Sequence, residues 1–160
     1  MSFRLAAAAA LGVLTAVPTA ASAQVLMQRD VSLRMALTIA EAALAECGTT
    51  TSVAIVDRAG RLRVFLQGDN ANPHNIELAR RKAYTARTFR RSSLEWAQRT
   101  ESGALVGQRS LADVIPLGGG LPINAGDDTI GAVGVSGAPG QEKDEACARA
   151  GLATVADQLK

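Results

Sequence analysis

The stretch between residues 72 and 91 constrains the fold of this chain more than any other. It reads NPHNIELARRKAYTARTFRR and begins with helix signals, because Asn72 can cap the first free N–H groups and Pro73 suits the first helical position. Mostly small side chains recur at spacings of three and four and share one face: Ile76, Ala79, Ala83 and Ala86. A helix over about 73–90 with so narrow a face can pack close to a sheet.

The predicted helix is also strongly basic. Six of the 17 Lys and Arg residues fall between positions 80 and 91, which gives the flanks of the helix a dense positive field. Such a field suits an anionic small molecule, a metal chelate or an acidic partner; the alternative is a solvated helix face. The whole chain carries a formal charge of only +2 and has one Trp, one Tyr and three Phe, which argues against nucleic-acid binding.

Residues 1–23 have the features of a secretory signal peptide. Arg4 supplies the positive charge, residues 5–17 form an apolar run, and Ala21-Ser22-Ala23 is an A-x-A cleavage site. The run is shorter than the roughly 20 residues that cross a membrane, and no second long apolar segment follows it, so we expect no membrane span in the mature chain. The alternative is an uncleaved anchor. We predict one mature domain over 24–160, periplasmic or secreted after cleavage near Ala23.

The hydrophobic pattern alternates between helical and strand periods. It predicts helices over about 31–46, 73–90, 94–99 and 142–158, and strands over about 52–57, 62–66, 114–117, 121–123 and 129–135. Asp30 is the expected N-cap of the first helix. Small residues alternate along 129–135, which indicates that another backbone packs closely there.

This order predicts an α/β (α+β) domain in which helices cover both faces of an antiparallel sheet of about five strands. The basic helix is expected on one face, and the first and last helices are expected together on the other.

Four motifs follow one another along the chain. They are VAIVD at 53–57 with Gly60, KAYTA at 82–86, GGLPI at 119–123, and IGAVGVSG at 130–137 followed by Asp144 and Cys147-Ala148. In this order they resemble the GlcG/HbpS-like family of haem-binding or haem-degrading proteins. The same domain is similar to the C-terminal part of PduO-type proteins. The resemblance covers about 30–159, and each motif is weak alone.

The resemblance implies a profilin-like domain with a five-stranded antiparallel sheet, a homo-oligomer, and haem or iron binding in the secreted branch of the family. Another branch is cytoplasmic and is associated with glycolate utilisation. The predicted signal peptide favours the secreted branch.

His74 is the only histidine and falls in the first turn of the basic helix. Haem iron takes a donor such as imidazole, thiolate, thioether or phenolate, so His74 is the foremost candidate for a metal ligand. Tyr84, Met27 and Met35 are weaker candidates, and the absence of C-x-x-C-H excludes covalent c-type attachment. The alternative for His74 is an exposed polar residue near a helix start.

Several other residues are candidates for ligand binding. Lys82 is either a contact to a propionate or another carboxylate, or a surface lysine, while Arg80, Arg81 and Arg87 are expected to be solvated. Further candidates are Tyr84, Arg90, Arg91, Gly119 and Gly120. The glycines of 118–120 can form a nest of N–H groups for an anion, or a β-bulge where only glycine fits.

The two cysteines, Cys47 and Cys147, are expected to form a disulfide. An exported chain enters an oxidising compartment, and antiparallel packing of the first and last helices would bring these positions together. Two buried free thiols are the alternative.

Two classes of function follow. The first is a secreted small-ligand-binding protein that takes haem or iron. The second is an enzyme or accessory protein that acts on a small carboxylate metabolite such as glycolate, and the sequence does not decide whether a reaction is catalysed.

Overall fold

The fold is a four-stranded antiparallel sheet with helices on both faces. A computed structural model describes residues 23–160, so the predicted leader lies outside the described residues except for Ala23. In chain order the elements are α1 (Leu33–Cys47), β1 (Ser52–Asp57), β2 (Leu62–Gln67), α2 (Asn75–Phe89), α3 (Ser93–Arg99), the 3-10 helix η1 (Gly103–Ser110), β3 (Gly120–Ala125), β4 (Asp128–Ser136), α4 (Gln141–Ala153) and the 3-10 helix η2 (Ala156–Leu159). Within residues 23–160, no helix is both long and apolar enough to cross a membrane.

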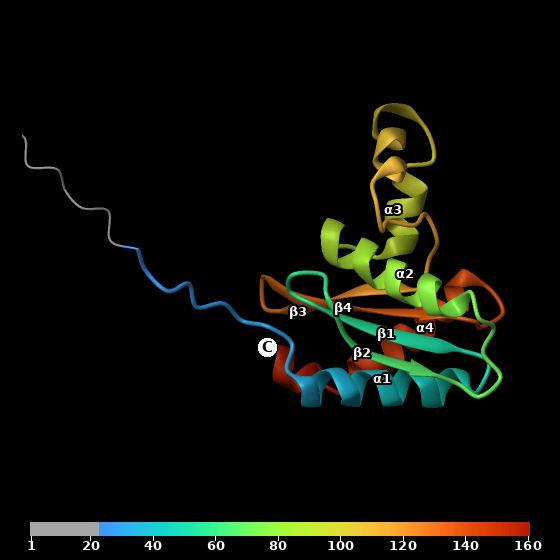
Figure 1. The fold of residues 1–160 in the computed structure, drawn as a ribbon, viewed down its shortest axis with the longest axis horizontal. Coiled ribbons are helices and arrows are strands. Elements are labelled where there is room, and N and C mark those ends of the chain that lie inside the picture. The colour runs from blue at the N-terminus through green and yellow to red at the C-terminus, as the bar shows by residue number, and fades with distance from the viewer. Residues whose placement is uncertain (1–22) are drawn as a thin grey trace, which may run out of the picture.

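The strands lie in the order β2-β1-β4-β3, and every neighbouring pair is antiparallel. The helices α1 and α4 cover one face of this sheet and α2 crosses the other, as predicted (Figure 1). The short helix α3 and η1 project from the α2 side as an arm. The central strands β1 and β4 are buried nearly throughout because both of their faces are covered.

The predicted strand at 114–117 is wrong, so the sheet has four strands and not about five. Val114 and Ile115 are buried as that pattern requires, but side chains of α2 take their backbone groups. The Arg81 guanidinium donates to the Val114 carbonyl, and the Ile115 N–H donates to Thr85 Oγ1 over 2.9 Å. With these bonds made, the segment stays buried without a neighbouring strand.

The N-cap residues of α1 and α2 also differ from the predicted ones. Ser32, not Asp30, caps α1, because Ser32 Oγ accepts the N–H of Met35 at 3.2 Å. Asp30 instead accepts the N–H groups of Val31 and Arg58 and ties the chain before α1 to the β1–β2 turn. The basic helix begins at Asn75, with His74 and not Asn72 at its N-cap.

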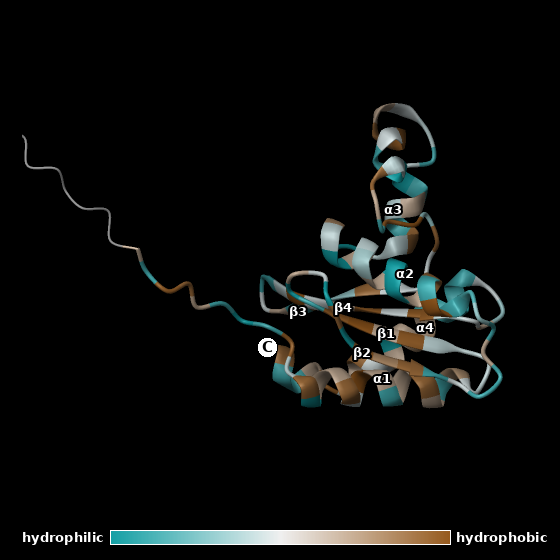
Figure 2. Cartoon of the chain, viewed as in Figure 1, coloured by the Kyte–Doolittle hydropathy of each residue, from teal (hydrophilic) through white to brown (hydrophobic). Residues whose placement is uncertain are grey.

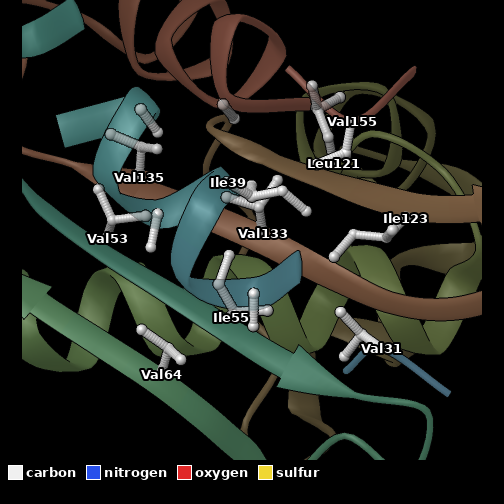
Figure 3. Packing of buried hydrophobic residues seen from close by; sticks show 14 of the residues in the cluster. Val31, Ile39, Val53, Ile55, Val64, Leu121, Ile123, Val133, Val135 and Val155 are labelled. Carbon is white, nitrogen blue, oxygen red and sulfur yellow. The ribbon is translucent and has the colours of Figure 1, made fainter. Parts of the chain in front are cut away.

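The main hydrophobic core lies between the sheet and the α1/α4 layer. Figure 3 shows aliphatic side chains from β1 and β4 meeting Ile39 of α1, and Val53, Ile55, Val133 and Val135 are fully buried there. Figure 2 shows hydrophobic residues along the strands and in α1, and several hydrophilic segments in α2.

The packing of α2 on the sheet is unusually close, as its small-residue face predicted. A Cβ at Gly134 of β4 would overlap the Ala79 carbonyl oxygen, and a Cβ at Gly120 of β3 would overlap that of Lys82. The helix backbone therefore rests directly on glycines of the sheet.

The disulfide between Cys47 and Cys147 is present, as predicted, with the two Cα atoms 5.9 Å apart. It joins the end of α1 to the middle of α4. Closing a loop of about 100 residues stabilises the fold by up to about 4.7 kcal/mol in the chain-entropy model.

The close contact predicts that Gly134→Ala destabilises the protein by about 1–3 kcal/mol, because the added methyl forces α2 away from β4. The measurement is the free energy of unfolding in urea. Gly107→Ala is the matched control, since nothing lies within 4 Å of a Cβ at that position. Equal stability of the two variants would contradict this packing.

Candidate functional site

A pocket of about 350 Å³ lies where β4 ends and α4 begins, beside the first turns of α2. Its lining is mostly polar and comprises Asn72, His74, Asn75, Leu78, Lys82, Leu117, Ser136, Gly137, Ala138, Gly140, Gln141 and Asp144. The pocket therefore gathers residues from motifs that are more than 60 positions apart in the sequence.

A buried ion pair forms one wall of this pocket. Lys82 Nζ lies 2.7 Å from Asp144 Oδ2, and the side chains of Lys82 and Asp144 are only 3% and 6% exposed. Lys82 also donates to the Val135 carbonyl at 3.1 Å, and Asp144 accepts the N–H of Ala138 at 2.9 Å. Lys82 is thus not the surface lysine of the alternative interpretation.

The close packing of α2 brings Lys82 to this position. Lys82 belongs to the helix on one face of the sheet, while Asp144 belongs to the first turns of α4 in the layer on the other. Between them lies Gly119, with a φ of +117°, where a Cβ would lie 2.8 Å from Asp144 Cβ and 3.2 Å from Lys82 Nζ. Only glycine leaves room for the pair to meet at the edge of the two layers.

Burial shifts both members of the pair towards their neutral forms. It lowers the pKa of the Lys82 ammonium and raises the pKa of the Asp144 carboxyl, because charged forms are disfavoured away from water. Their mutual attraction and hydrogen bond oppose both shifts. Titratable groups whose pKa values are shifted by burial and by a specific charged partner are common at functional sites.

A second polar group closes the pocket floor. The Asn75 side chain is buried, donates to the Thr50 carbonyl at 3.3 Å and accepts the Ser136 hydroxyl at 3.3 Å. These bonds join the start of α2 to the end of β4 and fix the α2 end that carries His74.

His74 is exposed at the mouth of the pocket. It occupies the N-cap position of α2 but makes no side-chain capping bond, and no hydrogen bond joins its ring to residues 23–160. Its ring is consequently available to a ligand. His74 and Lys82 are the predicted site residues that the structure brings into one pocket.

The other predicted ligand contacts lie elsewhere. Tyr84 packs against Gly60 in the β1–β2 turn, and Arg91 bonds to Glu95 at 2.8 Å near the stacked Phe89 and Trp96 rings. Arg90 ends α2 in a left-handed conformation. Eight residues of helix place Arg90 about 12 Å beyond Lys82 along the axis, so it does not share this pocket.

The three glycines at 118–120 have a structural use. The Gly118 N–H donates to Gln141 Oε1 and the Gly120 N–H donates to Ser93 Oγ, so these two groups are not free to hold an anion. Direct ligand contacts by Gly119 or Gly120 stay a prediction.

The neighbouring arginines, which were expected to be solvated, are all partly buried. Arg80 is 28% exposed and bonds to Glu77 and Asp113, Arg81 bonds to the Val114 carbonyl, and Arg87 is half-buried. Sequence reasoning also missed the role of Asp144, although its place in the last family-like motif was the available signal.

Removal of Lys82 tests the ion pair. Lys82→Met leaves Asp144 buried without its cation and should lower the free energy of unfolding by about 3–5 kcal/mol, while adding Asp144→Leu should restore much of the loss. Lys143→Met is the control, because the Lys143–Glu46 pair is half exposed and contributes below about 1 kcal/mol. Equal effects of the two lysine substitutions at pH 7 would contradict the role of the pair.

The loss in Lys82→Met should also depend on pH. Burial raises the folded-state pKa of Asp144 and Lys82 opposes this, so without Lys82 the pKa rises further above its unfolded value. In the variant this carboxyl therefore favours the fold below the unfolded pKa and loses that contribution as pH rises through the folded pKa. The variant should therefore come closest to wild type in acid, as measured by urea unfolding from acid to neutral pH. A loss that is constant with pH would contradict a buried, unpaired carboxylate.

Comparisons with known proteins agree with this fold. The profile of the family described as "Haem degrading protein HbpS-like" matches residues 30–153. The chain is 34% identical to HbpS of Streptomyces reticuli, whose double-mutant crystal structure matches with a TM-score of 0.79 over 88% of this chain and 98% of that chain.

Two further relatives are informative. PduOC, solved as a haem complex, is 27% identical, with a TM-score of 0.71 over 78% of this chain and 94% of that chain. A Citrobacter freundii protein, named as an uncharacterized 15.0 kDa protein in the dhaT-dhaS intergenic region, is 31% identical over 100 residues, which are 61% of this chain and 70% of that protein. Since the family profile spans nearly all of the folded domain, this chain belongs to the HbpS-like haem-degrading family.

Proposed function

We propose that this protein binds haem at the mouth of the pocket beside α2, with His74 as a ligand of the iron. The observation that carries the proposal is the exposed, unbonded ring of His74 on the rim of that pocket. Membership of the HbpS-like family and the likeness to PduOC, which was solved with haem, support it.

The residues at the pocket mouth fit haem better than bare iron. A porphyrin supplies four nitrogen ligands, so one protein imidazole is enough to hold the iron. Leu78 and Leu117 line the same pocket and supply apolar surface beside His74. Bound haem would bring redox and oxygen chemistry, while the protein residues bind and orient the group.

Lys82 has a different part in this proposal from the one expected. Its ammonium already donates to Asp144 and to the Val135 carbonyl, so a direct contact to a propionate would require an exchange of one carboxylate for another. We propose instead that Lys82 acts through Asp144, by holding the loop at the end of β4 that forms the pocket.

A hemin titration followed by the Soret band tests the site. We expect saturable binding at low micromolar hemin, and we expect His74→Ala to change the spectrum and weaken binding at least about tenfold, or about 1.4 kcal/mol. Asn72→Ala is the control, since Asn72 lines the same mouth without an iron donor.

A wild type without a saturable Soret change would refute haem binding. Binding that His74→Ala leaves unaltered in spectrum and affinity would refute the ligand assignment alone.

The polar interior favours a second candidate, which is binding or conversion of a small carboxylate. The buried Lys82–Asp144 pair, with both pKa values shifted towards the neutral forms, suits an acid–base role on a small polar molecule. An organic acid found by mass spectrometry in the purified protein, with no Soret response, would favour this function over haem binding.

We further propose that the chain is exported, cleaved near Ala23, and assembled as a homo-oligomer. The disulfide agrees with an oxidising compartment, and the projecting arm exposes Leu105, Val106 and Leu111, which suit contact with a second copy. N-terminal sequencing should find Gln24 first, and light scattering should give a mass above that of one chain. An intact leader would overturn the cleavage claim. A monomer at micromolar concentration would overturn the oligomer claim.

A further inference from the structure

A second polar pocket, of about 360 Å³, lies at the β1–β2 turn. Its lining residues are Gln28, Asp30, Arg58, Ala59, Arg61 and Arg87, so it contains three guanidinium groups and one carboxylate. The segment before α1, the turn after β1 and the C-terminal half of α2 each contribute to it. It shares no residue with the pocket beside His74.

Two of the three arginines already have carboxylate partners. Arg58 Nη1 lies 2.7 Å from Asp128 Oδ1, and Arg61 Nε lies 3.1 Å from Asp57 Oδ2. The side chain of Arg61 is 77% exposed, so most of its guanidinium remains open to a ligand.

Arg87 is different because it has no such partner. It makes neither an ion pair nor a hydrogen bond with the part of the chain between residues 23 and 160, although its Nε atom is buried. A buried donor without an acceptor costs about 1–3 kcal/mol, and more when it is charged. Asp30 lines the same pocket, but its Oδ1 accepts the N–H groups of Val31 and Arg58, and within residues 23–160 no hydrogen bond or ion pair joins Asp30 to Arg87.

The charge of Arg87 is also poorly balanced. Burial, followed by the charges of Arg90 and Arg58, lowers the pKa of its guanidinium, and the charges of Asp128 and Asp30 only partly oppose this effect. The pKa of Arg80 is raised instead, because that guanidinium bonds to Glu77 and Asp113. In the lining of this cavity, three guanidinium groups therefore face a single carboxylate, that of Asp30.

We propose that this pocket is a binding site for a small oxyanion, a carboxylate or a phosphate, held by Arg87 with Arg61 and Arg58 beside it. The planar fork of a guanidinium matches both groups in a bidentate manner. The carboxylate of Asp30 in the lining limits the net positive charge and favours a small anion over a large polyanion. This site is separate from the proposed haem site and does not depend on it.

Isothermal titration at constant ionic strength, with sodium chloride as the balancing salt, tests the site with inorganic phosphate and with acetate and citrate. Wild type should bind one of these anions saturably, and Arg87→Gln should lose at least about tenfold in affinity. Arg61→Gln should also weaken binding, and urea unfolding of this variant checks the fold, because the substitution removes the ion pair with the buried Asp57. Arg63→Gln is the control, because Arg63 is exposed on β2 and is not in the lining.

The difference in affinity between phosphate and the two carboxylates, acetate and citrate, identifies the class of ligand. No saturable binding of any of the three anions would overturn the proposal, and so would equal binding by wild type and Arg87→Gln. An equal loss in Arg63→Gln would show only a general effect of surface charge and would also overturn it. Hemin binding should be unchanged in Arg87→Gln, so failure of one site can be told from failure of the other.

Discussion

The close contact between α2 and the sheet is the constraint on which the rest of the structure depends. The helix carries alanines on its inner face, and Gly134 and Gly120 lie beneath it where any side chain would collide with its backbone. Little apolar volume is buried at this contact, so the larger core on the other face, between the sheet and α1 with α4, must supply most of the hydrophobic stabilisation. The disulfide between α1 and α4 reinforces that second layer.

The same contact creates the candidate site. Because α2 lies so close to β4, the Lys82 side chain reaches past the end of the sheet to the first turns of α4. The ion pair with Asp144 then ties one helical layer to the other at the point where the pocket opens. A buried ion pair of this kind adds little net stability, because desolvation offsets the attraction, but it fixes the geometry of the groups around it. The pair therefore serves to hold the pocket residues in place.

The sequence predicted the layers of the fold better than the chemistry of the site. The small-residue face of α2 and the hairpin at 52–67 follow from local patterns, and the structure agrees with both. The pairing of Cys47 with Cys147 followed from the predicted export and from the expected packing of the first and last helices, and the structure contains that disulfide. The segment at 114–117 has the composition of a strand, but its backbone bonds go to Arg81 and Thr85, which a local pattern cannot show. Lys82 is buried because it pairs with Asp144, which lies 62 positions away. A basic run by itself does not reveal that partner and predicts an exposed lysine.

The sequence shows how many basic residues the stretch contains, but it does not show where each side chain lies. The sequence places six of them on one short stretch. In the structure Lys82 lines the pocket beside His74 and Arg87 lines the pocket at the β1–β2 turn. Arg91 lines a third pocket, beside Phe89 and Trp96. One positive helix therefore serves several local environments rather than a single cleft, and neither Arg90 nor Arg91 lies beside His74.

The most direct measurement of the central claim is a crystal structure of the protein with haem, in which anomalous scattering locates the iron. The account predicts that the iron is bonded to a ring nitrogen of His74 at the mouth of the pocket that contains Lys82 and Asp144. Iron bonded to Tyr84 or another residue, or haem bound away from the start of α2, would contradict it.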